Sequence, residues 1–205
     1  MYDRVKKAHI KGINILPDEE SERKMYYLTN NILRSNGYRK YEISNYSKPG
    51  KECKHNIGYW QRKEYLGFGI GAASLYKENR YNNISDINKY IEVLTNNIKE
   101  NSINNVGNSS EVENQVNILN SIVKNLQQLT ERDRMEEFMF LGLRMMEGVS
   151  MEKFERYFGK PYMEIYGKVQ KKMEDKRFLI NDNGYVKLTE FGIDLSNYVM
   201  SEFLF

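Results

Sequence analysis

The stretch Glu52-Cys53-Lys54-His55-Asn56-Ile57-Gly58-Tyr59-Trp60 holds the only cysteine and the only tryptophan of the 205-residue chain, together with one of its two histidines. It follows a strand-like run at 41–46 and the turn Lys48-Pro49-Gly50, and it precedes a glycine-rich run at 66–74. Soft and aromatic side chains between two segments of permissive backbone are typical of a cofactor site. The pattern alone does not name the cofactor.

Within this stretch, His55 and Tyr59 are four residues apart, so a helical turn would place them on one face. A neutral imidazole is an axial ligand of haem iron, and Tyr59 and Trp60 offer flat apolar surface with a polar edge. The residues alone favour a structural role, in which His55 and Asn56 hydrogen-bond a loop while the two rings fill a core. Cys53 is an alternative soft ligand, but a lone buried thiol is the expected state.

The run that follows alternates glycines with apolar residues: Leu66-Gly67-Phe68-Gly69-Ile70-Gly71-Ala72-Ala73-Ser74. On a strand, one face of this run would lack side chains, and a ligand could approach the backbone there. The spacing is not the dinucleotide-binding fingerprint, because the required third glycine position and helix context are missing. Close packing between strands is the alternative interpretation, and both can hold.

Several motifs in this order resemble the radical S-adenosylmethionine (SAM) family of oxygen-independent coproporphyrinogen III oxidase-like proteins. The matching segments are Tyr41-Glu42-Ile43-Ser44-Asn45-Tyr46, Lys48-Pro49-Gly50, His55-Asn56-x-x-Tyr59-Trp60 and Leu66-Gly67-x-Gly69-x-Gly71-Ala72. The His-Asn-x-x-Tyr-Trp pattern is most similar to the HemW branch, whose members are regarded as haem chaperones. The resemblance covers residues 17–74 and 136–204.

This resemblance implies that the protein binds or transfers haem or a porphyrin, with a haem-recipient protein as a further partner. The implied haem-binding residues are His55, Asn56, Tyr59 and Trp60, with His55 as the ligand of the iron. The implied SAM-facing residues are Gly67, Gly69, Gly71 and Ala73, and no catalytic residue is implied in this chain. A fragment of a true oxygen-independent coproporphyrinogen III oxidase is the alternative.

The resemblance also sets a limit, because the family binds its iron–sulfur cluster through a Cys-x3-Cys-x2-Cys loop that this sequence lacks. Cys53 alone cannot supply the three or four thiolates of a [4Fe–4S] cluster. We therefore expect a C-terminal fragment that is not catalytic by itself, with SAM and the [4Fe–4S] cluster bound only in the full-length parent. A naturally shortened paralogue is the other interpretation.

The expected fold is α/β plus α+β. Residues 1–100 are expected to form the C-terminal part of an incomplete radical SAM α/β barrel, 101–130 a linker with an extra helix, and 131–205 a winged-helix-like domain. In the first part, a helix beginning near Pro17 and ending near Gly37 precedes a strand at 39–46, as in one αβ step of a barrel. Ser85 is expected to cap a further helix, the polar run at 101–110 to be flexible, and 112–126 to be helical.

Local signals outline the elements of the expected C-terminal domain. They are the capping box Thr130-x-x-Asp133, Ser150 and Gly159 around a short helix, Pro161 opening the next one, the hairpin turn Asp182-Asn183-Gly184, and Thr189 capping a last helix. A methionine-rich stripe at 135–146 predicts adaptable core rather than a ligand site. Three helices, a hairpin and a closing helix are typical of a winged-helix module.

Composition and charge narrow the class of protein. The chain has 40% hydrophobic and 29% charged residues, a composition typical of globular domains, and its net charge is +3. Residues 1–100 are net basic, which suits an anionic porphyrin, although random surface charge explains it as well. No apolar run reaches the ~18 residues of a membrane span, and a single cysteine fits a reducing compartment, so we expect a cytoplasmic protein.

A winged helix also raises the alternative of a nucleic-acid-binding module. The presumed recognition helix carries a basic cluster: Lys168, Lys171, Lys172, Lys176 and Arg177. Residues 131–205 are net acidic, however, and a net-acidic module neutralises phosphates poorly. We therefore expect no nucleic-acid partner. The sequence does not predict an oligomeric state.

Overall fold

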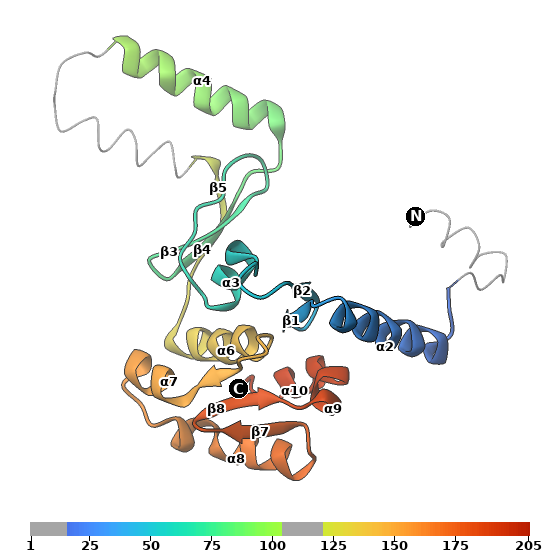
Figure 1. The fold of residues 1–205 in the computed structure, drawn as a ribbon. Coiled ribbons are helices and arrows are strands. Elements are labelled where there is room, and N and C mark those ends of the chain that lie inside the picture. The colour runs from blue at the N-terminus through green and yellow to red at the C-terminus, as the bar shows by residue number, and fades with distance from the viewer. Residues whose placement is uncertain (1–15, 104–120) are drawn as a thin grey trace. The chain divides into compact units, whose positions relative to one another are not determined.

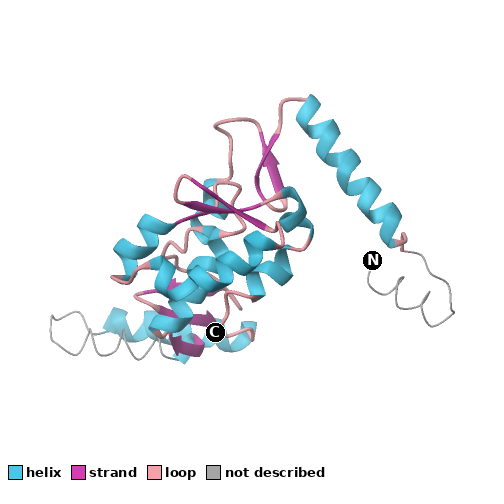
Figure 2. Cartoon of the chain, turned by 90° about the horizontal axis from the view of Figure 1, so that it is seen from below, coloured by secondary structure: helices cyan, strands magenta, loops and turns pink. Residues whose placement is uncertain are grey.

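The computed structural model describes residues 16–103 and 121–205, in which helices alternate with short strands (Figures 1 and 2). The chain separates into two compact units, residues 1–53 and residues 54–205. Within the described residues, no helix combines the length and apolar content that crossing a membrane requires.

The first unit contains α2 (Glu19–Ser35), which begins at the predicted place. The Asp18 side chain accepts a hydrogen bond from the Ser21 backbone N–H at 2.7 Å, which is a helix N-cap. Gly37 follows the last turn with φ of 79°, as the predicted stop requires. None of the α2 residues is buried.

A tight hairpin follows, formed by β1 (Arg39–Glu42) and β2 (Asn45–Ser47) in antiparallel pairing. The prediction of one continuous strand at 39–46 is therefore wrong. The Glu42 carboxylate is fully buried and accepts hydrogen bonds from the Ser44 backbone N–H and the Asn45 side chain. These local side-chain bonds close a turn that competes with an extended strand.

The second unit begins with α3 (Lys54–Trp60) and a three-stranded antiparallel sheet. Its strands are β3 (Ala73–Tyr76), β4 (Asn79–Asn83) and β5 (Val123–Gln128), in the order β3-β4-β5. The helix predicted over 112–126 is wrong where it meets β5, because tertiary pairing of Val123 with Asn83 outweighs helical periodicity. Residues 121 and 122 are helical, and residues 112–120 of the predicted helix lie outside the described residues.

The helix α4 (Ile87–Ile103) lies between β4 and β5 in the chain. The Asp86 carboxylate accepts hydrogen bonds from the backbone N–H groups of Asn88 at 2.9 Å and Lys89 at 3.1 Å. Asp86 therefore caps the helix, where the sequence predicted Ser85. Because α4 reaches Ile103, the first part of the predicted 101–110 linker is helical, and the remainder lies outside the described residues.

The C-terminal part of the second unit packs helices around a small sheet (Figure 1). Its helices are α6 (Glu131–Gly142), α7 (Met151–Phe158), α8 (Tyr162–Asp175), α9 (Glu190–Asp194) and α10 (Ser196–Ser201). Its strands are β6 (Val149–Ser150), β7 (Leu179–Asp182) and β8 (Tyr185–Leu188), in the order β6-β8-β7. The fully buried side chains of Met139, Phe154, Met173, Val186 and Phe203 form its core.

The predicted local signals of this part are confirmed. Thr130 and Asp133 form a reciprocal capping box on α6, and Ser150 caps α7, which ends at Gly159 with φ of 65°. Pro161 and Thr189 precede α8 and α9, and Asn183 and Gly184 have positive φ in the β7–β8 turn. Two details differ. The predicted last helix is interrupted at Leu195, and β6 adds a strand that the sequence did not predict.

Candidate functional site

Helix α3 places an imidazole beside two tyrosine rings. The rings of His55 and Tyr59 meet edge to face with centroids 4.6 Å apart, and Tyr59 meets Tyr65 in the same way, also at 4.6 Å. His55 is exposed, whereas Tyr59 and Tyr65 are half-buried, and burial raises the pKa of the Tyr65 hydroxyl. The predicted shared face of His55 and Tyr59 is therefore confirmed, and Tyr65 is an addition that sequence spacing did not indicate.

Trp60 points elsewhere, because five residues along a helix correspond to a rotation of ~140° from His55. Its ring lies 4.4 Å from the Arg144 guanidinium, in cation–π geometry. Its indole Nε1 is buried and has no hydrogen-bond partner among the described residues. The structure thus brings His55 and Tyr59 together and separates both from Trp60.

Two candidate binding residues of this stretch remain, Asn56 and Cys53. Asn56, the residue after His55 in α3, is half-buried. Cys53 is exposed, so the expectation of a buried thiol is wrong. No group of three or more His, Cys, Asp or Glu side chains in 16–103 and 121–205 gathers in a way that could hold a metal ion.

The glycine-rich run is a loop up to residue 72, and only Ala73 and Ser74 belong to β3. The predicted strand with one bare face is therefore wrong. Gly69 and Gly71 have φ of 92° and 65°, which other residues rarely adopt. At Gly67, a Cβ atom would lie 2.2 Å from the Ala73 carbonyl oxygen. Gly69 and Gly71 thus allow the backbone to turn, and Gly67 allows a close contact with the backbone of Ala73.

Buried polar side chains hold this loop in place. The Asn83 side-chain amide donates to the carbonyl oxygens of Gly67 at 3.1 Å and Gly69 at 2.8 Å. Ser74 Oγ accepts from the Gly67 N–H at 2.9 Å. The loop nevertheless leaves apolar side chains in solvent, and Phe68 is 87% exposed.

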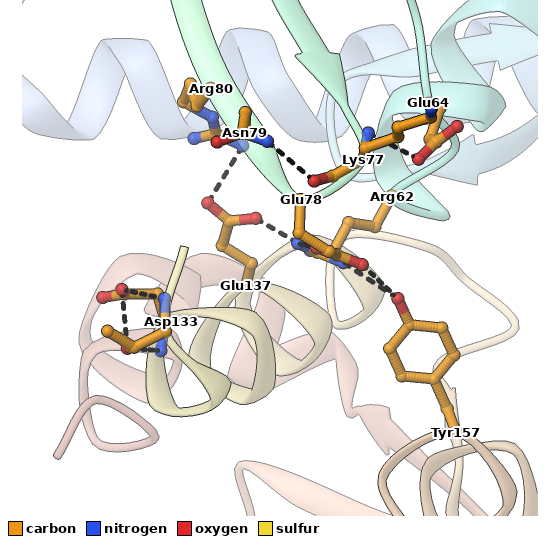
Figure 3. Close-up of polar contacts among 10 residues, drawn as sticks. Arg62, Glu64, Lys77, Glu78, Asn79, Arg80, Asp133, Glu137 and Tyr157 are labelled. Carbon is orange, nitrogen blue, oxygen red and sulfur yellow. Dashed lines mark hydrogen bonds and ion pairs between the residues drawn. The ribbon is translucent and has the colours of Figure 1, made fainter. Parts of the chain in front are cut away.

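An ion-pair cluster centred on Arg62 lies just after α3 (Figure 3). The Arg62 side chain is 5% exposed; its Nε donates to Glu137 at 2.8 Å, and its Nη2 pairs with Glu78. Tyr157 donates its hydroxyl to Glu78 at 2.7 Å, and Arg80 pairs with Glu137 at 2.9 Å. The hydrogen bond from Arg62 lowers the pKa of Glu78, and burial raises the pKa of Tyr157.

This cluster joins the β3–β4 turn and the end of α3 to helices α6 and α7. Sequence analysis missed it, because its members are 16 to 95 residues apart in the chain. In the structure, Arg62, Lys77 and Glu78 adopt positive φ without being glycine, and such backbone is strained unless neighbouring contacts fix it.

A cavity of about 260 Å³ lies between the α3 end and the C-terminal part. Its lining residues are Trp60, Gln61, Arg62, Lys63, Phe138, Gly142, Met145, Glu147, Gly148, Val149, Ser150, Lys153 and Tyr185. Trp60 is the member of the predicted haem-binding set that lines it.

The side chains permit one kind of ligand chemistry and not another. An exposed imidazole held by an aromatic neighbour can ligate haem iron, so His55, Tyr59 and Tyr65 fit a haem. A [4Fe–4S] cluster does not fit, because it needs three or four thiolates and the chain has one cysteine.

Known proteins resemble this chain in sequence. Residues 129–195 match the HemN C-terminal domain. The chain is 34% identical to the heme chaperone HemW of Lactococcus lactis subsp. lactis over 194 residues, which are 95% of this chain and 45% of the relative. It is 30% identical to the heme chaperone HemW of Bacillus subtilis over the same shares. The chain thus spans less than half the length of these curated relatives.

A solved structure has a similar fold. The coproporphyrinogen III oxidase HemN from Escherichia coli, described as a radical SAM enzyme, superposes with a TM-score of 0.64 at 14% identity, covering 92% of this chain and 42% of that one. At this identity the likeness shows the mixed helix-and-sheet fold alone. Together with the relatives, it confirms that the chain is similar to the C-terminal portion of oxygen-independent coproporphyrinogen III oxidase-like radical SAM proteins of the HemW type.

Proposed function

We propose that this chain is the haem-binding C-terminal portion of a HemW-like protein that binds or transfers haem. The observation that carries the proposal is the exposed imidazole of His55, set against Tyr59 and, through it, Tyr65. The HemW relatives support it, because their names describe heme chaperones. A haem-recipient protein is the corresponding partner.

In this proposal His55 is the iron ligand. Its neutral imidazole binds iron through a ring nitrogen, and the edge-to-face contact with Tyr59 restricts how the imidazole turns. Because His55 is exposed, an iron porphyrin can reach it without unfolding α3. Asn56 and Trp60 are assigned to haem binding by the motif, although Trp60 lies on another side of the helix.

The glycine loop is proposed to face SAM in the full-length parent, which would also supply the [4Fe–4S] cluster. Gly69 and Gly71 support this assignment, because among the described residues no atom beyond the glycine and its two chain neighbours lies within 4 Å of where each Cβ atom would be. That open space lets a ligand approach the backbone. Ala73 is exposed at the start of β3, beside the same loop.

The proposed architecture remains an incomplete radical SAM barrel at 1–100, a connection at 101–130 and a winged-helix-like domain at 131–205. The order α6-β6-α7-α8-β7-β8, with sheet order β6-β8-β7, supports the last of these, because a winged helix follows two or three helices with a hairpin. A cytoplasmic location is part of the proposal, and the exposed free thiol of Cys53 suits a reducing compartment.

Nucleic-acid binding is less well supported. In the basic cluster of α8, Lys171 pairs with Asp175 and Lys172 with Glu202, each at 2.6 Å. Partnered ammonium groups offer little to phosphates. A true oxidase activity of this chain is not supported either, because the chain lacks the thiolates of the cluster.

Haem titration of a His55→Ala variant tests the proposal. We expect the variant to lose the imidazole-type shift of the Soret band and to bind haem about tenfold more weakly or worse, a change of ~1.4 kcal/mol. Tyr59→Leu should weaken binding less, because one aromatic contact is worth ~1 kcal/mol.

His9→Ala is the matched control, because His9 is the other histidine of the sequence, and it should leave spectrum and affinity unchanged. The titration is repeated on a longer protein that carries these residues, so that a missing portion of the pocket does not mask the result. Unchanged haem spectra and affinity after His55→Ala in that protein would contradict the assignment and leave Cys53 or no protein ligand.

A further inference from the structure

The cavity beside Trp60 has walls from two distant parts of the chain. Trp60, Gln61 and Lys63 come from the end of α3 and the residues after it, while the opposite wall comes from α6, β6, α7 and β8. The Arg62 cluster ties these two parts together. The cavity is therefore held open by fixed elements, as a preformed ligand site is.

Its polar lining has more donors than acceptors. The Trp60 Nε1–H is buried and finds no hydrogen-bond acceptor within 16–103 and 121–205, and an unpaired buried donor is unfavourable. The ammonium groups of Lys63 and Lys153 have no ion-pair partner in the part of the chain that the structure describes. Arg62 is already paired with two carboxylates, and Glu147 is the carboxylate among the lining residues.

The lining also has an apolar part, and two glycines shape the cavity. Phe138, Met145 and Val149 supply the apolar surface. A Cβ atom at Gly142 would lie 2.7 Å from Val149 Cγ2, and one at Gly148 would lie 2.3 Å from the Val186 carbonyl oxygen. At about 260 Å³, the cavity is smaller than the ~300–1,000 Å³ typical of sites for drug-sized ligands, so it suits a group of about one ring.

We propose that this cavity binds a small, flat carboxylate. The carboxylate accepts the Trp60 Nε1–H and lies near the ammonium groups of Lys63 and Lys153, and its apolar body packs against Phe138 and Met145. Two sources share this chemistry: a free one-ring acid, and one propionate-bearing edge of a porphyrin. The proposal needs neither haem iron nor His55.

Benzoate is the probe, and benzamide is its neutral counterpart of the same shape. Because Trp60 is the only tryptophan, protein labelled with ¹⁵N-tryptophan gives one indole N–H signal that reports this site directly. We expect benzoate to shift that signal downfield in a saturable way, since the N–H gains a charged acceptor. Benzamide should bind at least about threefold more weakly, because it lacks the charge that the lysines attract.

Lys63→Met and Lys153→Met should each weaken benzoate binding about threefold, while Lys168→Met on α8, outside the cavity lining, should not. A second titration adds metal-free protoporphyrin: displacement of benzoate assigns the site to the porphyrin edge, and co-binding assigns it to a separate small acid. An indole signal that moves with neither probe overturns the proposal. So does equal binding of benzoate and benzamide that is unaffected by both cavity lysine variants.

Discussion

The C-terminal module, residues 129–205, buries a group of aromatic side chains together, whereas the motif region, residues 54–96, leaves comparable groups in solvent. Phe154, Tyr162 and Tyr166 are each at most 1% exposed, and their rings lie 5.4 to 5.8 Å apart. In the motif region, Phe68 is 87% exposed and His55 lies open to solvent. Both regions are rich in aromatic residues and differ in what those residues contact.

This difference in burial indicates which residues contribute to folding stability and which are available for ligand binding. A buried aromatic side chain contributes free energy of folding through the area it removes from water. An exposed apolar or imidazole group contributes little to folding and is available to a ligand. We therefore expect substitutions in the module to change the free energy of unfolding, and substitutions in the motif region to change ligand binding first.

The largest expected effect is that of Phe154→Ala. This side chain is fully buried and contacts the rings of Phe138, Phe158, Tyr162 and Tyr166. Truncating it should lower the free energy of unfolding by ~3–5 kcal/mol, measured by urea titration with circular dichroism. If the alanine variant does not fold, Phe154→Leu should show a smaller loss of ~1 kcal/mol.

Phe68→Ala is the matched substitution in the motif region, and it should change the free energy of unfolding by less than ~0.5 kcal/mol because the side chain is exposed. Equal losses at the two positions would remove the contrast between the regions.

The second effect concerns the Arg62 cluster, which joins the two regions. Arg62→Met should lower the free energy of unfolding by ~2 kcal/mol, because it leaves the carboxylates of Glu78 and Glu137 without their buried partner. Arg80→Met is the control; its side chain is 41% exposed and pairs with Glu137, so it should cost ~0.5 kcal/mol. A larger loss for Arg80→Met than for Arg62→Met would contradict this account.

The same cluster predicts a pH dependence. Because Arg62 lowers the pKa of Glu78 below its ordinary value of 4.5, the pair stabilises the folded chain fully above that pH. The stabilisation is lost as pH falls through the lower, folded-state pKa. The difference in free energy of unfolding between the parent chain and Arg62→Met should therefore shrink below about pH 4.5. If the difference in free energy of unfolding stays constant as the pH falls below that value, ionised Glu78 is not its source.

Much of the module could be predicted from sequence because its signals are local. Thr130 and Asp133 are three residues apart, and each satisfies the other's backbone N–H; the β7–β8 turn requires Asn183 and Gly184 at neighbouring positions. Such patterns are readable without knowing what they pack against.

The motif region was harder to predict because its structure depends on distant residues. The Gly67 loop takes its shape from Asn83, 16 residues away, and β5 is a strand because it pairs with β4 across α4 and the undescribed segment. The shared face of His55 and Tyr59 and the different direction of Trp60 follow from helical spacing. The contact of the Trp60 ring with Arg144 and the pairing of Arg62 with Glu137 depend instead on residues far along the chain. The proposed roles of the site residues remain predictions.

The smallest expected effect compares two helix caps. Thr130→Ala removes the capping box of α6, a helix that buries Met135 and Met139, so it should lower the global free energy of unfolding by ~1 kcal/mol. Asp86→Ala removes the cap of α4, whose Ile87 and Ile91 are each 55% exposed. Because those residues contribute little buried area, we expect faster amide hydrogen exchange in the first turn of α4 and a global change below ~0.5 kcal/mol. If Asp86→Ala lowers the global free energy of unfolding as much as Thr130→Ala does, α4 unfolds together with the module. The contrast in stability between the two regions would then not include α4.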